Sequence, residues 1–413
     1  MRQVPELLAP AGNLEKLKIA LLYGADAVYC SGKAFGLRAG AGNLSEIELE
    51  EGTAFAHQMG RKVYITVNII PHNQDLQGLP EYLGFLAAIG IDALIVSDPG
   101  VISLAREVVP HIPLHLSTQA NAVNWRSVRF WQEQGVQRVI LARELSCEEI
   151  AAIRRKTEVE LEVFVHGAMC MAYSGRCLLS MYLTGRDANR GDCAQPCRWR
   201  YSVVEEKRPG EYLALEEDER GTYIFNSKDL CLIDYIPELV KLGLASLKIE
   251  GRMKGIHYVG TVTRVYRQAL DAYRQGPEGF EVRGEWRQEL EKVSHRDYTT
   301  GFFCHSPGAG DHVYGSSSYI RNYDFVGLVK DYNPVEKKAL IEQRNPFAVG
   351  DKVEVTGPET ETFSFPIKEI FGAEEGTPLK TAPHPQQLVW VPVPRPLKPY
   401  DLVRRIRVEG QDI

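Results

Sequence analysis

An alternation of short apolar runs with helical patterns over the first 275 residues most restricts the fold of this chain. Eight apolar runs predict strands, at Glu6–Leu8, Ala27–Cys30, Lys62–Asn68, Ala93–Ser97, Leu114–Thr118, Arg138–Ala142, Leu161–Val165 and Ala245–Ile249. Strands that alternate with helices are typical of parallel α/β proteins. Eight such units predict a TIM-type (β/α)8-like barrel, and an open doubly wound sheet is the alternative.

Helical periodicity follows each run, and capping residues mark the ends of the expected helices. The helical patterns cover Leu14–Tyr23, Leu44–Met59, Leu79–Ile89, Val101–Val108, Trp125–Glu133, Cys147–Arg155, Lys228–Leu242 and His257–Arg274. Asn13, Asp98 and Ser146 stand where an N-cap side chain accepts a backbone N–H. Glycines at positions 24, 60, 90, 135 and 243 stand where helices often end in the left-handed conformation.

Four of the eight cysteines fall between residues 161 and 200. Six residues separate Cys170 from Cys177, fifteen more lead to Cys193, and three lead on to Cys197. Thiolates are soft ligands, so this set favours zinc or an iron–sulfur cluster over magnesium, calcium or manganese. The uneven spacing, without the paired Cys-x2-Cys of zinc ribbons, favours iron and sulfide. The alternative is that all four are buried structural cysteines. A loop rich in Gly, Arg and Asn is poorly suited to a packed apolar core, which disfavours this alternative.

The residues that follow the predicted strands are polar, and in a TIM-type barrel this end of the strands holds the active site. They are Pro10–Asn13, Ser31, Asn68, Asp98, Gln119, Asn121, Arg143, Glu144, His166, Glu250 and Arg252. The cysteine-rich loop leaves the seventh strand at Gly167, so we expect it on the same face. His166 is a candidate general acid or base, a hydrogen-bonding partner of a cluster, or a structural histidine. Glu144 and Glu250 either act in the site or form ion pairs with neighbouring arginines.

The composition is that of an ordinary globular chain with a slight negative charge. Its 413 residues are 44% hydrophobic and 25% charged, with a net charge of -6. No secretory signal is visible at the start, and no apolar stretch approaches the ~20 residues of a membrane helix. We therefore expect a cytoplasmic protein, whose cysteines indicate metal binding or catalysis over disulfides. Nucleic-acid binding would need a local basic surface, for which Arg186, Arg190, Arg198 and Arg200 are candidates.

The pattern changes beyond residue 275, which indicates further parts of the chain. Residues 276–319 lose the regular alternation, and residues 320–413 show short strands separated by Asn-Pro and Gly-Pro turns. We expect a barrel over residues 1–275 with the cysteine loop at 167–200, a linker over 276–319, and a small β-barrel over 320–413. Basic residues of the last part, including Lys330, Lys338, Arg404 and Arg405, suit contact with RNA.

Several motifs resemble those of the U32 family, historically called collagenase-like peptidases. They are EVFVHGAMC (162–170), YSGRCLLS (173–180), GRDANRGDCAQPCRWRY (185–201), SKDL (227–230) and SLKIEGRMK (246–254). The likeness extends from LLAPAGN near the start to the region beyond residue 320. Within the family it is greatest for the branch that hydroxylates the wobble uridine of tRNA. Other members act on ribosomal RNA cytidine or on a ubiquinone precursor, and a few are peptidases.

The resemblance implies an iron–sulfur cluster of the 4Fe-4S type, with prephenate as cosubstrate and tRNA as partner. The implied cluster ligands are Cys170, Cys177, Cys193 and Cys197. In some relatives the fourth ligand lies outside the Cys-x3-Cys pair, so Cys231, expected to open the helix after SKDL, competes with Cys197. We assign catalysis to His166 and Glu144, and substrate binding to Arg186, Arg190, Lys248, Glu250 and Arg252.

Two other functions stay open at this point. A cysteine peptidase needs a thiol activated by a histidine, and Cys170 with His166 would be that pair, although the other clustered cysteines would then have no function. The His-Glu-x-x-His pattern of metallopeptidases is absent from the sequence. A zinc-stabilised RNA-binding protein without catalytic activity would use the same four thiolates, so the identity of the metal separates it from a hydroxylase.

Overall fold

A computed structural model describes residues 4–33, 35, 42–170, 172–174, 176–190, 192–199, 217–218, 221–222, 228–305 and 319–407. The chain forms two compact units. The first consists of Met1–Trp286 and His295–Tyr319, and the second of Arg287–Ser294 and Ile320–Ile413. Both units therefore draw on residues 276–319, the segment expected as a linker. Among the described helices, none combines the length and the apolar composition that crossing a bilayer requires.

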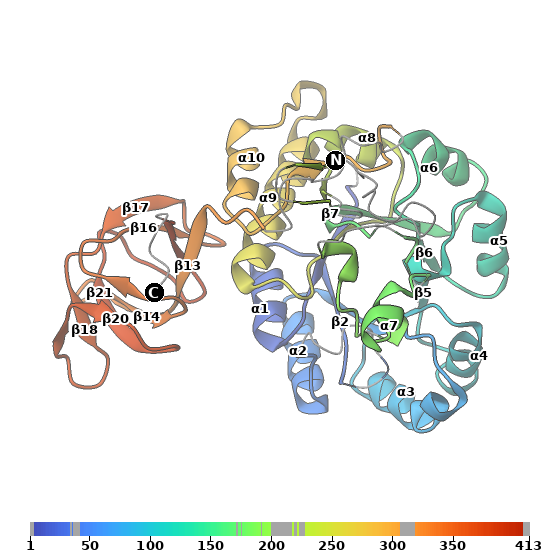
Figure 1. The fold of residues 1–413 in the computed structure, drawn as a ribbon, viewed down its shortest axis with the longest axis horizontal. Coiled ribbons are helices and arrows are strands. Elements are labelled where there is room, and N and C mark those ends of the chain that lie inside the picture. The colour runs from blue at the N-terminus through green and yellow to red at the C-terminus, as the bar shows by residue number, and fades with distance from the viewer. Residues whose placement is uncertain are drawn as a thin grey trace, which may run out of the picture. The chain divides into compact units, whose positions relative to one another are not determined.

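Eight parallel strands close into a barrel in the first unit (Figure 1). They are β1 (Glu6–Pro10), β2 (Ala27–Cys30), β3 (Lys62–Val67), β4 (Ala93–Val96), β5 (Leu114–Leu116), β6 (Arg138–Ile140), β7 (Glu160–Ala168) and β11 (Ser246–Ile249). Strand β11 closes the ring because Ser246 pairs with Glu6 of β1 and with Glu162 of β7. The predicted TIM-type barrel is confirmed, and each predicted strand overlaps one of these eight.

Helices surround the barrel (Figure 1). They are α1 (Leu14–Leu22), α2 (Glu46–Gln58), α3 (Leu79–Ala88), α4 (Pro99–Val108), α5 (Trp125–Glu133), α6 (Cys147–Arg154), α8 (Ile236–Lys241) and α9 (Ile256–Gln275). The side chains of Asn13, Asp98 and Ser146 accept backbone N–H groups in the first turns, as predicted. The five glycines predicted at helix ends all have positive φ. Each N-cap contributes about 1 kcal/mol, so local chemistry accounts well for where these helices begin and end.

The segment Lys228–Leu242 does not form the single helix that its periodicity predicted. It forms strand β10 (Asp229–Cys231), a short 3-10 turn (Ile233–Tyr235) and then α8. Strand β10 pairs antiparallel with the end of β7, where Cys231 lies opposite His166, and β12 (Tyr298–Thr299) pairs with β10. Cys231 therefore ends a strand and does not open a helix. The prediction was wrong because the backbone partners of β10 lie far away in sequence, where a local pattern cannot reveal them.

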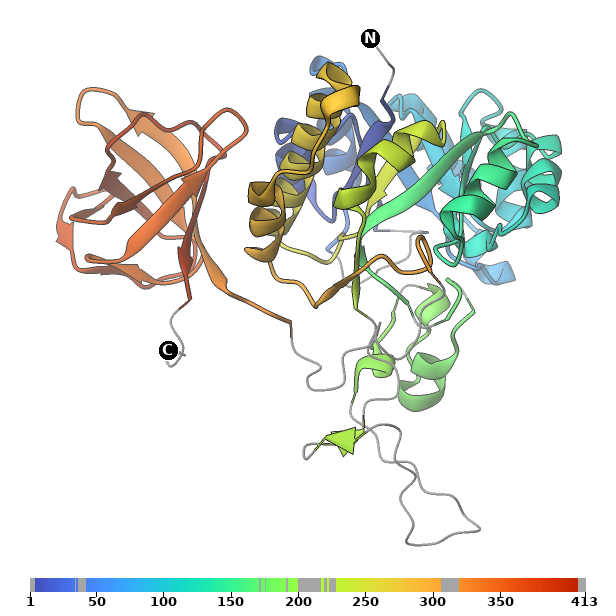
Figure 2. The same ribbon diagram turned by 90° about the horizontal axis from the view of Figure 1, so that it is seen from above.

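The cysteine-rich segment begins where β7 ends and lies outside the barrel, beyond the ends of its strands (Figure 2). It contains helix α7 (Leu179–Thr184) and short 3-10 turns at Ala188–Arg190 and Pro196–Arg198. Gly167 has a φ of +109°, and a Cβ atom there would lie 2.4 Å from the backbone oxygen of Glu250. A glycine is therefore required where the chain leaves β7 past the end of β11.

The second unit is an antiparallel sheet that curls into a half-barrel (Figure 2). In order of pairing its strands are β17 (Phe363–Pro366), β16 (Lys352–Thr356), β22 (Leu402–Ile406), β13 (Tyr323–Asn333), β14 (Lys338–Gln343), β21 (Leu388–Pro392), β18 (Ile370–Gly372) and β19 (Pro378–Leu379). Its core is made of branched aliphatic and aromatic side chains. The fully buried Arg404 donates to Glu289 at 2.7 and 2.8 Å and to Glu354 at 2.7 Å. The predicted all-β module is thus a curled sheet with a buried ion-pair network.

Candidate functional site

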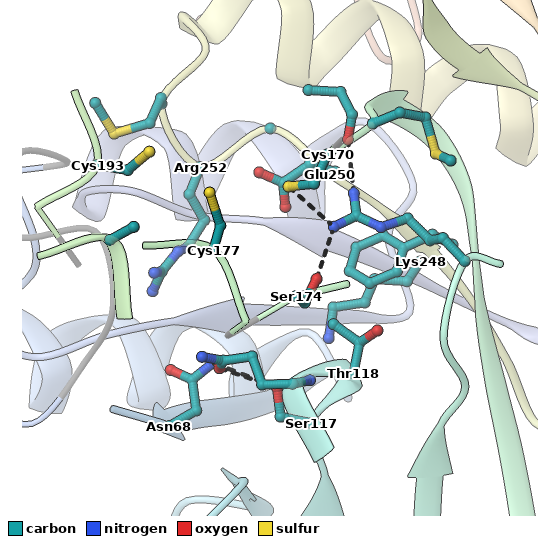
Figure 3. Close-up of a pocket in the computed structure, with 18 of the residues that line it drawn as sticks. Asn68, Ser117, Thr118, Cys170, Ser174, Cys177, Cys193, Lys248, Glu250 and Arg252 are labelled. Carbon is teal, nitrogen blue, oxygen red and sulfur yellow. Dashed lines mark hydrogen bonds between the residues drawn. The ribbon is translucent and has the colours of Figure 1, made fainter. Parts of the chain in front are cut away.

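One cavity of about 220 Å³ lies where the carboxyl ends of the barrel strands meet the cysteine-rich segment (Figure 3). Several barrel strands contribute a side chain to its lining, among them Tyr29 of β2, Thr66 of β3, Ile95 of β4, Ile140 of β6 and Phe164 of β7. Active sites of TIM-type barrels occur at this end of the strands. The volume is below the ~300–1,000 Å³ of pockets that enclose drug-sized ligands, so the cavity suits a compact organic molecule or a single base.

All four cysteines predicted as metal ligands, Cys170, Cys177, Cys193 and Cys197, line this cavity as free thiols. The backbone N–H of Gln195 donates to Cys193 Sγ at 3.3 Å. Arg143 Nη2 lies 3.8 Å from Cys170 Sγ. A cysteine sulfur accepts hydrogen bonds of this kind, and its thiolate form is the one that binds metals.

The donor set fits a thiolate-ligated metal centre, because four soft ligands from one loop match an iron–sulfur cluster or zinc. Within the described part of the chain, no three His, Cys, Asp or Glu side chains converge as ligands of one metal ion. The four thiols therefore share a cavity without forming a closed coordination shell. Cys231 is not among the described residues that line the cavity, so Cys197 is the candidate fourth ligand that the fold brings to the other three.

Arg143 holds the first turn of the cysteine-rich segment against the barrel. Its Nη1 donates to the backbone oxygen of Ala168 at 2.6 Å, and its Nη2 donates to Ser174 Oγ at 3.1 Å. The guanidinium also lies 4.8 Å from the centre of the Phe164 ring. A rigid, planar group with several donors suits this task, because one side chain fixes two points of the loop.

Lys248 enters the cavity from β11 and is almost fully buried. Its Nζ lies 3.0 Å from Glu162 Oε1 and 4.3 Å from the centre of the Tyr29 ring. Arg138 donates to Glu162 at 3.3 Å and to Glu6 at 2.7 Å, so a chain of charged groups continues through the barrel interior. Burial lowers the pKa of Lys248, and the carboxylate of Glu162 opposes that shift.

Glu250 and Arg252 follow β11 and line the same cavity. Tyr29 Oη donates to Glu250 Oε2 at 3.2 Å, and Arg252 Nη1 donates to Thr66 Oγ1 at 3.0 Å. The charged side chains of the described lining are the cations Arg143, Lys248, Arg252 and Lys254 and the carboxylate Glu250. Lys248 is paired with the buried Glu162, so Arg143, Arg252 and Lys254 are the cations of the lining that could attract an anionic group.

The two predicted catalytic residues are not among the described residues of the lining. His166 is 1% exposed, and its ring centre lies 5.9, 5.6 and 5.3 Å from those of Tyr258, Tyr266 and Tyr298. Burial, assisted by the charge of Lys254, lowers the pKa of His166 to about 3. Glu144 is half-buried after β6, and burial raises the pKa of its carboxyl. His166 thus lies in an aromatic enclosure that keeps it neutral.

Arg186, predicted to bind substrate, is not among the described residues of the lining. Arg186 Nη2 forms an exposed ion pair with Asp192 at 2.7 Å. The backbone of Arg190 ends a 3-10 turn, and its side chain lies outside the described part of the structure. Of the predicted substrate-binding residues, the fold brings Lys248, Glu250 and Arg252 together with the cysteines.

Residues 12–312 match the family model for Peptidase family U32, and residues 321–404 match the model for the Peptidase family U32 C-terminal domain. The chain belongs to peptidase family U32. Its motifs at 162–201 and 246–254 supply the four cysteines of the cavity and its charged residues other than Arg143. The stretches that resemble the family's motifs thus meet at one site in this chain.

Named relatives of this U32 chain have more than one activity. The chain is 46% identical to tRNA hydroxylation protein P1 of Bacillus subtilis, over 97% of this chain and 94% of that protein. It is 39% identical to the 23S rRNA 5-hydroxycytidine synthase of Escherichia coli, over 65% of this chain and 39% of that protein. It is 33% identical to the collagenase of Porphyromonas gingivalis, over 88% of this chain and 89% of that protein.

Some lining residues of this U32 chain were not predicted from its sequence. Two-residue alternation along β3 would have placed Thr66 on the same face as Asn68, which was predicted at the barrel mouth. Lys254 belongs to the SLKIEGRMK motif and would have followed from it. Tyr319, which comes from far along the chain, has no local signal that marks it as part of the site.

Proposed function

We propose that this chain is an RNA hydroxylase that uses an iron–sulfur cluster and prephenate to hydroxylate C5 of the wobble uridine of tRNA. The main supporting observation is a cationic cavity at the barrel mouth that all four clustered cysteines line. Near full-length similarity to a tRNA hydroxylation protein supports the substrate. The relative named for 5-hydroxycytidine supports the class of reaction, hydroxylation of a pyrimidine in RNA.

Cys170, Cys177, Cys193 and Cys197 would hold the cluster, in the 4Fe-4S form that four thiolates suit. When bound, such a cluster supplies one-electron transfer at the edge of the cavity. The contacts of Arg143 to the backbone at Ala168 and to Ser174 would keep Cys170 at the cavity wall. The apolar ring of Phe164 lies against that guanidinium and helps to hold it in place.

The cations of the cavity would bind the carboxylates of prephenate. Arg252 is 4% exposed and presents a planar guanidinium, which can bind a carboxylate through two hydrogen bonds. Lys248 is the described lining residue whose lowered pKa best suits proton transfer. Arg186, and with it Arg190, would contact RNA phosphates, since an exposed ion pair such as Arg186–Asp192 is easily exchanged.

A peptidase is the second candidate, which the collagenase relative favours. The thiol and histidine that such an enzyme would need are Cys170 and His166, but His166 is enclosed by tyrosine rings and neutral. Only Cys170 of the two is among the described residues of the cavity lining. This geometry gives the peptidase less support than the hydroxylase receives from the four thiols.

Metal analysis of protein purified without oxygen tests the proposal. We expect about four iron and four sulfide per chain with a visible charge-transfer band, and prephenate-dependent 5-hydroxyuridine in tRNA incubated with the protein. One zinc per chain and a colourless protein would overturn the iron–sulfur assignment and favour the zinc-stabilised RNA-binding protein. Collagen cleavage without tRNA modification would establish the peptidase instead.

A further inference from the structure

A small cluster of neutral amide and hydroxyl groups forms part of the cavity wall, at the ends of β3 and β5. Asn68 follows β3, and Ser117 and Gln119 follow β5, where Ser117 caps a short 3-10 turn. Asn68 Nδ2 donates to Gln119 Oε1 at 2.6 Å, and Ser117 Oγ donates to the same oxygen at 3.3 Å. In the view of Figure 3, Asn68 and Ser117 lie on the side of the cavity opposite to Cys170 and Cys177.

These two hydrogen bonds orient the Gln119 amide. Its oxygen faces Asn68 and Ser117, so its nitrogen is the end left for another partner. Gln119 is 8% exposed, and its Nε2 makes no hydrogen bond to the residues that the structure describes. A buried N–H donor without a partner is unfavourable, and such groups in native proteins call for an explanation. Gln119 belongs to the cavity lining, so a ligand whose hydrogen-bond acceptor reaches Nε2 would satisfy this donor.

The charges of the lining residues indicate which chemical group of a ligand would accept the hydrogen bond from Gln119. Carboxylates are drawn to the cations Arg252 and Lys254, whereas the Asn68, Ser117 and Gln119 side chains are neutral. An uncharged carbonyl oxygen is the acceptor that best matches a neutral amide N–H. Uracil presents such an oxygen at C4, next to the C5 atom that would be hydroxylated, whereas cytosine presents an amino donor there.

We propose that Gln119 determines base specificity by donating from Nε2 to O4 of the target uracil. This inference rests on the proposed function, since it names the residue that reads the base at the same site. An unstacked base in an RNA loop exposes this edge, and hydrogen bonds to that edge are the usual way in which proteins read single-stranded RNA. Asn68 and Ser117 position the Gln119 amide and prevent it from presenting its oxygen instead.

Competition binding of two anticodon stem-loop RNAs, identical except for U or C at the target position, tests the inference. The full-length protein with its bound metal should prefer the U form by roughly 10-fold or more, in line with the discrimination of one well-placed base contact. Gln119→Glu replaces the donor by an acceptor, so it should remove or reverse the preference. Gln119→Leu should abolish the preference without reversing it, because it removes both functions.

Gln132→Glu is the matched control, because it adds the same charge at an exposed position on α5 and should keep the wild-type preference. Thermal unfolding and iron content would show that each variant is as stable as the wild type and binds as much iron. Equal affinity of the wild type for the two RNAs, or a U preference unchanged in Gln119→Glu, would overturn the inference. A U preference that depends on Gln119, in a protein that hydroxylates neither RNA, would support the inference and refute the proposed reaction.

Discussion

The cysteines of this chain lie in different environments, which suit them to different functions. Cys170 lies in the cavity lining, with its Sγ 3.8 Å from Arg143 Nη2. Cys30, which is fully buried in β2, has its pKa raised to about 12 by desolvation, so it stays a protonated packing residue. The same residue type thus serves as a ligand candidate in one place and as a small apolar group in the other.

Replacing Cys170 or Cys177 by Ala should abolish both cluster loading and tRNA modification, because a cluster with a missing thiolate ligand is lost or unstable. Iron content and nucleoside analysis measure the two effects. Cys304→Ala is the control, since Cys304 is exposed and is not among the described residues that line the cavity. Modification that persists in Cys170→Ala would refute the metal assignment.

The enclosed His166 predicts a pH-dependent stability. Burial lowers its pKa to about 3, against ~6.5 in the unfolded chain, so the unfolded state takes up the proton first as pH falls. This contribution to stability is complete above about pH 6.5 and is lost as pH falls towards 3. Between pH 8 and pH 5 the wild type should lose about 2 kcal/mol from this group, a loss that His166→Phe should not show. Urea unfolding at several pH values measures the difference, and equal pH slopes for the two proteins would contradict the prediction.

At the scale of elements, the junction between β7 and the cysteine-rich segment decides where the thiols lie. The chain must leave β7 next to the residues that follow β11, and the backbone N–H of Glu250 donates to the backbone oxygen of His166 at 2.8 Å. Gly167 makes this approach possible because it has no Cβ atom to meet the Glu250 oxygen. The distance from the cysteines to Lys248 of β11, and to Arg252 just after this strand, therefore depends on Gly167.

Gly167→Ala should destabilise the chain by roughly 3 kcal/mol and reduce iron loading, since it combines a strained positive φ with a backbone clash. Gly185→Ala is a matched control: its φ is +70°, and nothing lies within 4 Å of the added Cβ. It should cost only the conformational strain, about 1 kcal/mol. Urea unfolding of the two variants separates the clash from the strain, and equal losses would show that the approach to Glu250 does not matter.

At the scale of the whole molecule, the two units are stabilised in different ways. The barrel has a strand ring with charged groups in its interior, and the curled sheet has an apolar core with Arg404 buried between Glu289 and Glu354. The prediction that Arg404 contacts RNA was wrong, because this side chain is fully buried in the ion-pair network, whereas Lys330 is exposed and can reach a phosphate. The thiols and the cavity belong to the first unit. We therefore infer that chemistry and part of the RNA affinity reside in separate units.

A chain shortened to residues 1–319 should still bind the proposed cluster but should bind tRNA at least about 10-fold more weakly, because positive charges that could contact phosphates are lost. Iron content and a tRNA titration at fixed salt concentration measure the two properties. Substituting Lys330 and Lys338 in the full-length chain provides a control that removes charge without removing the unit. An unchanged affinity after truncation would place the RNA contact on the barrel.

Sequence alone indicated the alternation of strands and helices, the helix caps, and Cys170, Cys177 and Cys193 as candidate ligands, because each of these depends on local periodicity, capping chemistry or spacing. The closed barrel and the choice of Cys197 over Cys231 came from the fold. The sequence also placed Asn68, Gln119 and Arg143 at the mouth, since strand ends can be located from the apolar runs. Only the tertiary structure decided that His166 is enclosed, that Cys231 lies on a strand, and which residues share the cavity. Burial and pairing depend on partners far apart along the chain, and a local pattern contains no information about those partners.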